Sequence, residues 1–76
     1  MSKERISEIN TDIRMLENQI KAREDIARRT ADIAISMGQT DFARIEMKDC
    51  HRECKPYNDK IHTLREEKAK IEEVAR

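Results

Sequence analysis

Residues 36–42, SMGQTDF, interrupt a chain whose pattern is otherwise helical from end to end. Gly38 is the only glycine among the 76 residues, and glycine closes helices because it adopts the left-handed conformation without a steric penalty. Thr40 follows as a candidate N-cap for a second helix. A connection this short makes two helices antiparallel neighbours, so we predict an αα-hairpin. The predicted elements are a helix at about 3–37, a turn at about 38–40 and a helix at about 41–74.

Apolar residues on both sides of this turn recur in alternating steps of three and four, the heptad pattern of a helix packed lengthwise on another. The first seam comprises Ile6, Ile9, Ile13, Leu16, Ile20, Ala27, Ala34 and Met37, with Arg23 and Thr30 in the remaining places. The second comprises Ala43, Met47, Cys50, Cys54, Tyr57, Ile61, Leu64, Lys68, Ile71 and Ala75. Antiparallel pairing places residues whose numbers sum to about 78 opposite each other. The expected pairs include Ala27 with Cys50, Ile20 with Tyr57, and Ile13 with Leu64. The pattern predicts an all-α, coiled-coil-like rod.

Pro56 falls inside the second helical segment, where proline removes a backbone hydrogen bond to the carbonyl of Arg52. The seam keeps its spacing across this proline, which favours one helix kinked at Pro56. The alternative is a helix that ends near Cys54 and a third helix that begins at Pro56, where a first-turn proline is well tolerated.

Composition excludes several classes of function. Lys plus Arg and Asp plus Glu each number 16, so no net charge draws the chain towards nucleic acid or an anionic membrane. The sequence has no glycine-rich phosphate loop and no metal-spaced histidine and carboxylate motif, so we expect neither an enzyme nor a cofactor. No run is long and apolar enough to cross a bilayer or to form a secretory leader. We therefore expect a cytoplasmic protein with reduced thiols.

Cys50 and Cys54 lie four residues apart on the second seam, which allows two interpretations. Two sulfurs on one helix face form half of a structural zinc site, so a complete site would need the same pair from a second chain. Alternatively, cysteine acts as a small buried residue where alanines in the first helix allow close packing. We favour the packing role and predict no metal site within one chain.

Apolar residues also lie outside the two seams, clustered towards the turn. They are Ile26, Ile33, Ile35, Phe42 and Ile45. A two-helix hairpin cannot bury residues on so many sides, and exposed apolar patches tend to mark contacts. We interpret these five residues as an oligomer or partner surface and predict a dimeric helical bundle.

A basic row follows the exposed side of the second helix. It consists of Arg44, Lys48, Arg52 and Lys55, and a parallel acidic row of Glu46, Asp49 and Glu53 flanks it. The row is a candidate contact for nucleic acid or for an acidic partner. The balanced charge favours an ordinary solvated face that pairs between helices or subunits.

These observations favour a non-enzymatic protein-protein interaction module that associates with itself and with a larger protein, as an adaptor or an inhibitor. Short, charge-rich helical proteins of this kind occur among the accessory and counter-defence products of phages and mobile elements. The alternatives are a small RNA- or DNA-binding regulator that uses the basic row, and a structural spacer or thiol- or metal-gated switch.

Overall fold

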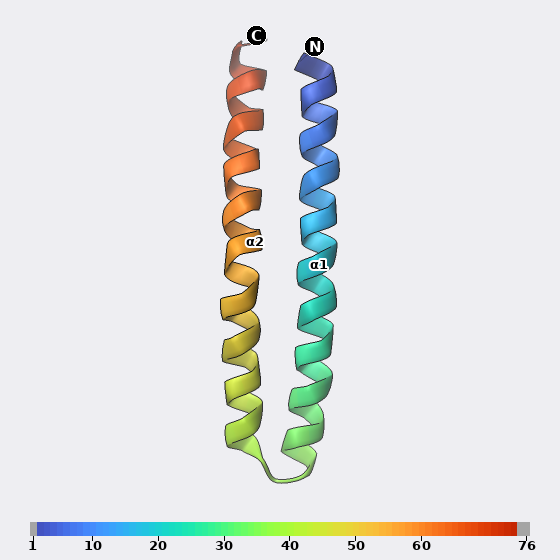
Figure 1. The fold of residues 1–76 in the computed structure, drawn as a ribbon, viewed down its shortest axis with the longest axis vertical. Helices are drawn as coiled ribbons and strands as arrows, with labels where there is room; N and C mark the ends of the chain where they lie inside the picture. Colours follow the sequence, from blue (N-terminus) through green and yellow to red (C-terminus); the bar gives the residue numbers. More distant parts are fainter. Residues whose placement is uncertain (1, 75–76) are drawn as a thin grey trace.

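A computed structural model describes residues 2–74, which form two long helices joined by a short turn. Helix α1 spans Ser2–Ser36 and helix α2 spans Thr40–Val74. The helices run antiparallel and pack along their whole length, so that the start of α1 and the end of α2 lie at the same end of the rod (Figure 1). The molecule is a rod of 56 × 15 × 14 Å. The prediction of an all-helical hairpin is confirmed, whereas the predicted seam position Ala75 lies outside the described residues.

The turn ends α1 in a Schellman motif. Gly38 adopts a φ of +79°, its amide donates to the carbonyl of Ile35, and the amide of Gln39 donates to the carbonyl of Ala34. The carbonyl of Gln39 then accepts the first helical hydrogen bond of α2, from the amide of Ala43. Gln39 is therefore the N-cap residue, and the expectation for Thr40 is wrong, because Thr40 is already the first residue of α2.

The interior of the rod changes character along its length. At the open end, Ile9, Ile13 and Ile61 are buried, and Leu16, Ile20, Leu64 and Ile71 pack against them. Towards the middle, Ala27 packs with Cys50 and Cys54, and beside the turn the interior consists of Ala31, Ala34 and Ala43. The predicted pairing of Ala27 with Cys50 is confirmed. Large side chains thus fill one half of the rod and small ones the other.

Three residues of the predicted seams lie outside this interior. Met37, Met47 and Tyr57 are exposed, although the heptad pattern assigns them to the interface. Small residues let helix backbones approach closely and leave no volume for a long side chain between them. Where Ala34, Ala43 and the cysteines set the spacing, a methionine at a seam position must turn outward. Tyr57 instead lies beside the larger Leu16 and Leu64.

Pro56 lies within α2, which continues through it to Val74. The alternative of two separate helices in this segment is therefore wrong. Pro56 is exposed, and it has no amide hydrogen to donate to the carbonyl of Arg52. A bend at this position stays a prediction.

Candidate interaction surfaces

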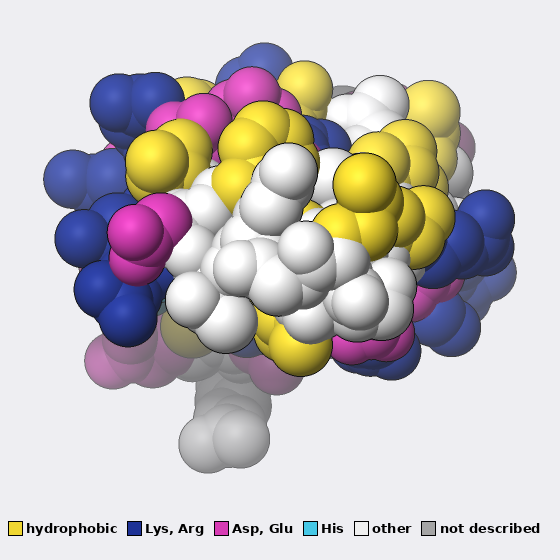
Figure 2. Space-filling model, turned by 90° about the horizontal axis from the view of Figure 1, so that it is seen from below, with side chains coloured by type: hydrophobic (Ala, Val, Ile, Leu, Met, Phe, Trp, Pro, Cys, Tyr) yellow, Lys and Arg dark blue, Asp and Glu magenta, His cyan; other side chains and the backbone are white. Residues whose placement is uncertain are grey.

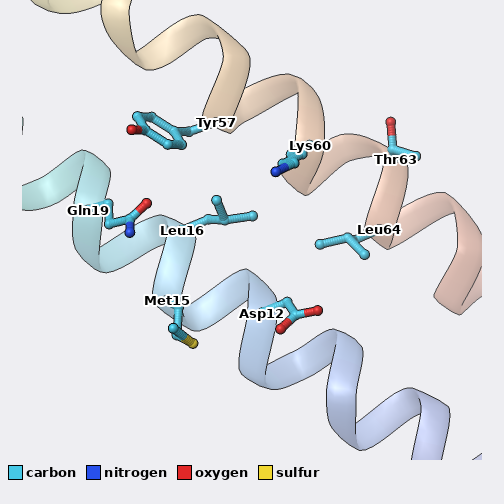
Figure 3. A pocket seen from close by; sticks show the side chains of 8 residues that line it. All are labelled: Asp12, Met15, Leu16, Gln19, Tyr57, Lys60, Thr63 and Leu64. Atoms are coloured by element: carbon cyan, nitrogen blue, oxygen red, sulfur yellow. The ribbon is translucent and has the colours of Figure 1, made fainter.

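A groove runs along one side of the open half of the rod. It has a volume of about 540 Å³ and is lined by Asp12, Met15, Leu16, Gln19, Tyr57, Lys60, Thr63 and Leu64. Leu16 and Leu64 extend into the space between the helices, and the Tyr57 ring of α2 lies close to Gln19 and Leu16 of α1 (Figure 3). The floor of the groove is apolar, with Asp12 and Lys60 as charged residues at its edge. Tyr57, a predicted seam residue that is not buried in the interior, therefore lines this groove.

A smaller hollow of about 190 Å³ lies beside the turn, lined by Thr30, Ile33, Ala34, Met37, Gln39 and Phe42. Ile33, Met37 and Phe42 are all exposed. Seen from the turn end, apolar side chains gather mainly on one side of the loop over both helices, while Lys and Arg occupy the flanks (Figure 2). We call Ile26, Ile33, Met37 and Phe42 the turn patch.

The groove and the turn patch share one side of the rod. Asp12, Gln19, Ile26 and Ile33 follow each other at intervals of seven, each one residue before a seam position of α1. In a heptad pattern such a series forms one straight strip along the helix pair. Since Asp12 and Gln19 line the groove and Ile33 lines the hollow at the turn, both features belong to this strip. We call this side the groove face.

Arg23 holds the two helices together between the groove and the turn patch. Its Nη1 atom is buried and lies 2.9 Å from Glu46 Oε1, and its Nε donates to Glu53 Oε2 at 2.5 Å. The hydrogen bond with Glu53 raises the pKa of Arg23, against the opposing effect of burial. Sequence reasoning placed Arg23 on the seam but missed these partners. The sequence indicates these partners through the seven-residue spacing of Glu46 and Glu53, each of which lies one residue before a seam position of α2.

A second interhelical ion pair lies at the open end. Arg5 binds Glu67 through two hydrogen bonds, one from Nε to Oε2 and one from Nη2 to Oε1 at 3.0 Å, and also contacts Glu8. The hydrogen bond from Arg5 lowers the pKa of Glu67. Both ion pairs link α1 to α2, so they contribute to the register of the hairpin.

The five apolar residues predicted as a contact surface do not lie together. All five are exposed, each by 50% to 60%. Ile26, Ile33 and Phe42 belong to the turn patch on the groove face. Ile35 follows the buried Ala34 by one residue, so it points about 100° away from the interior, on the flank opposite the groove face. Ile45 lies two residues past the buried Ala43, on the outer surface of α2. The predicted surface is therefore divided between different sides of the rod.

Cys50 and Cys54 are free thiols in the interior, each 4% exposed. They border a groove of about 250 Å³ on the side opposite the groove face, which is completed by Ile20, Glu24, Arg28, Met47, His51 and Asn58. Burial raises the pKa of Cys54, and the neighbouring Cys50 raises it further. A raised pKa disfavours the thiolate, which is the nucleophile and the metal ligand. Across residues 2–74, no three His, Cys, Asp or Glu side chains are grouped to hold a metal ion. The burial of both thiols against Ala27 supports the packing role.

The predicted basic row is only partly free of acidic partners. Arg52 pairs with Asp49 at 2.5 Å, whereas Arg44, Lys48 and Lys55 form no ion pair within residues 2–74. Sequence reasoning missed a second basic series on α1. Arg14, Lys21 and Arg28 follow at intervals of seven, and Arg28 lines the groove beside the cysteines. The side of the rod that carries the cysteines is therefore basic on both helices.

No known protein family, curated protein or solved structure matches this chain at a significant level. Within residues 2–74, neither helix is long and apolar enough to cross a membrane.

Proposed function

We propose that this hairpin is a non-enzymatic interaction module that associates with itself and docks on a larger protein, as an adaptor or an inhibitor. The observation that carries the proposal is the extent of its surface. The chain exposes 6254 Å². A compact folded monomer of 9.0 kDa exposes about 4,900 Å². The excess of about 1,400 Å² reflects a thin interior, and it includes the turn patch and the apolar groove.

The interior alone provides little stabilisation. Within residues 2–74 the only large side chain that is completely buried is Ile9. Small domains with so little buried surface commonly depend on oligomerisation. In this proposal α2 also bends at Pro56, because the carbonyl of Arg52 lacks its helical donor. The bend lets the rod follow a curved partner surface.

The test of self-association is the mass in solution. Sedimentation equilibrium of the wild-type chain should give a dimer at micromolar concentration, and the double variant Ile33→Asp with Phe42→Asp should give a monomer whose helices melt at a lower temperature by circular dichroism. Ile45→Asp is the matched control, since Ile45 is equally exposed but lies outside the groove face. A wild-type monomer at millimolar concentration would overturn the proposal.

Docking on a larger protein has a separate test. The immobilised wild-type chain should retain a partner from nuclease-treated lysate of its native host, and the double variant at Ile33 and Phe42 should retain much less. Ile45→Asp should retain the same amount as the wild type. Equal recovery with all three chains would show that the turn patch does not form the docking site.

A small RNA- or DNA-binding regulator is the second candidate function, favoured by the basic residues on the cysteine side. Lys48 and Lys55 on α2 and the series Arg14, Lys21 and Arg28 on α1 form no ion pair within residues 2–74. Two parallel basic strips suit a phosphate backbone, whose binding strengthens at low salt. Glu17 and Glu24 lie between the strips and weaken the field.

Fluorescence anisotropy with labelled RNA and DNA duplexes at low salt tests this candidate. Replacing Lys48 and Lys55 with Glu should weaken binding about tenfold or more, because two phosphate contacts are lost and reversed in charge. Lys70→Glu on another side of α2 should have a much smaller effect. Absence of binding at the lowest salt would reject this function.

A further inference from the structure

The groove face carries a large apolar hollow and an exposed apolar patch. The hollow is the groove, whose floor contains Leu16, Tyr57 and Leu64. The patch is the turn patch, where Ile33, Met37 and Phe42 are exposed around the smaller hollow. Within residues 2–74, no apolar side chains fill the groove, and no segment covers the turn patch. One rod cannot bring them together, because they lie at different heights along the same strip.

A two-fold rotation relates the positions of the groove and the turn patch along the rod. On α1 the groove is lined by residues 12–19 and the hollow at the turn by residues 30–37. At 1.5 Å per residue, both lie about 14 Å from a level near residues 24 and 25. That level adjoins Arg23 and its two carboxylate partners. A two-fold rotation about an axis crossing the rod there exchanges the height of the groove with the height of the turn patch.

We propose that a second copy of the chain packs antiparallel on the groove face about this axis, so that Ile33 and Phe42 of each copy fill the groove of the other. The inference rests on the proposed self-association and specifies its surface and orientation. In this arrangement α1 lies against α1 of the second copy and α2 against α2. The result is a four-helix bundle with an isologous interface.

The available area is sufficient for such a dimer. A stable interface of standard size removes about 800 Å² from each partner. That amount is about half of the 1,400 Å² by which this chain exceeds a compact monomer of its mass. The alternative, with turn patch on turn patch in parallel rods, would leave an apolar groove of about 540 Å³ open in both copies.

The partly buried cation at the centre of the proposed interface is paired within its own chain. Arg23 already has Glu46 and Glu53 as partners within its own chain, so its guanidinium is paired before a second copy arrives, and the three side chains together carry one net negative charge. Ala22 lies on the same strip as Met15, seven residues further along. Its small side chain at the level of the axis allows the two α1 helices to approach.

Cross-linking tests the orientation, in a background where Cys50 and Cys54 are replaced by Ala. Met15→Cys and Ile33→Cys chains are treated with a short bismaleimide, separately and after mixing and re-equilibration. Within antiparallel dimers of one variant the introduced thiols lie about 25 to 30 Å apart, whereas residue 15 of one chain lies beside residue 33 of the other. We expect a covalent dimer from the mixture only.

Ala22→Cys and Ser36→Cys form a matched pair, since Ala22 and Ser36 occupy the same strip and are both exposed. Ala22→Cys should cross-link with itself and Ser36→Cys should not. Circular dichroism and sedimentation confirm that each variant stays helical and dimeric. A wild-type dimer with equal or preferred cross-linking through Ser36, or no product from the mixture, would overturn the orientation and leave self-association intact. A monomeric wild type would overturn both.

Discussion

Replacement of Pro56 by alanine should stabilise the hairpin. A proline inside a helix is about 3 kcal/mol less favourable than alanine, because it removes one hydrogen bond and its ring collides with the preceding turn. Pro56 is exposed, so removal of its ring sacrifices little buried surface. Alanine also makes the unfolded chain more flexible, which reduces the gain in stability by about 0.4 to 1 kcal/mol. The net gain is about 2 kcal/mol. For a chain of this size the melting temperature should rise by about 10 °C.

Thermal melts followed by circular dichroism at 222 nm measure this shift, with all chains at the same concentration because association alters the apparent melting temperature. Lys55→Ala is the matched control, since Lys55 is exposed and adjoins the proline within the same helix. It should change stability by less than about 0.5 kcal/mol. A Pro56→Ala variant that melts at or below the wild-type temperature would refute the reasoning, and would mean that contacts requiring the proline stabilise the folded state.

Four further outcomes follow from the packing and the ion pairs. Gly38→Ala should lose about 1 kcal/mol in denaturant titrations, since a side chain at φ +79° is strained although nothing lies within 4 Å of the added carbon. Ile9→Ala should lose about 2 to 5 kcal/mol by the same measurement, because Ile9 is completely buried. The pKa of Glu67 is lowered by Arg5, so its contribution is present above the unfolded carboxyl pKa and disappears as the pH falls through the folded value. Acid titration of Glu67→Gln should therefore show a shallower loss of stability. Burial and a raised pKa should make Cys54 alkylate far more slowly at pH 8 in the folded chain than in denaturant, as mass spectrometry would record.

The hairpin itself was predictable, because two local signals agree. Gly38 marks the turn, and the three-four alternation of apolar residues on both sides identifies the packed faces. The pairing of Ala27 with Cys50 follows from those signals alone, since the turn length sets the register. Heptad periodicity gives the direction in which each side chain points.

Periodicity does not give the distance between the helices, and the errors have that origin. Met37 and Met47 have the direction of interior residues, yet the small neighbours that bring the helices together leave them no room. Tyr57 also has the direction of an interior residue, yet it is exposed and lines the groove. The ion pairs of Arg23 were also missed, because a seam position occupied by a charge has no single partner until the flanking residues of the other helix are placed.

The uneven distribution of side-chain size along the rod has a consequence for folding kinetics. Contacts near the turn close short loops but bury mainly alanine, whereas the isoleucines of the open end become buried only after the longest loop has closed. Most of the entropy is therefore lost before the largest stabilisation is gained, so a half-closed hairpin is less stable than either the open chain or the complete rod. The two arms should consequently form and separate in a single cooperative step, without progressive fraying from the open end.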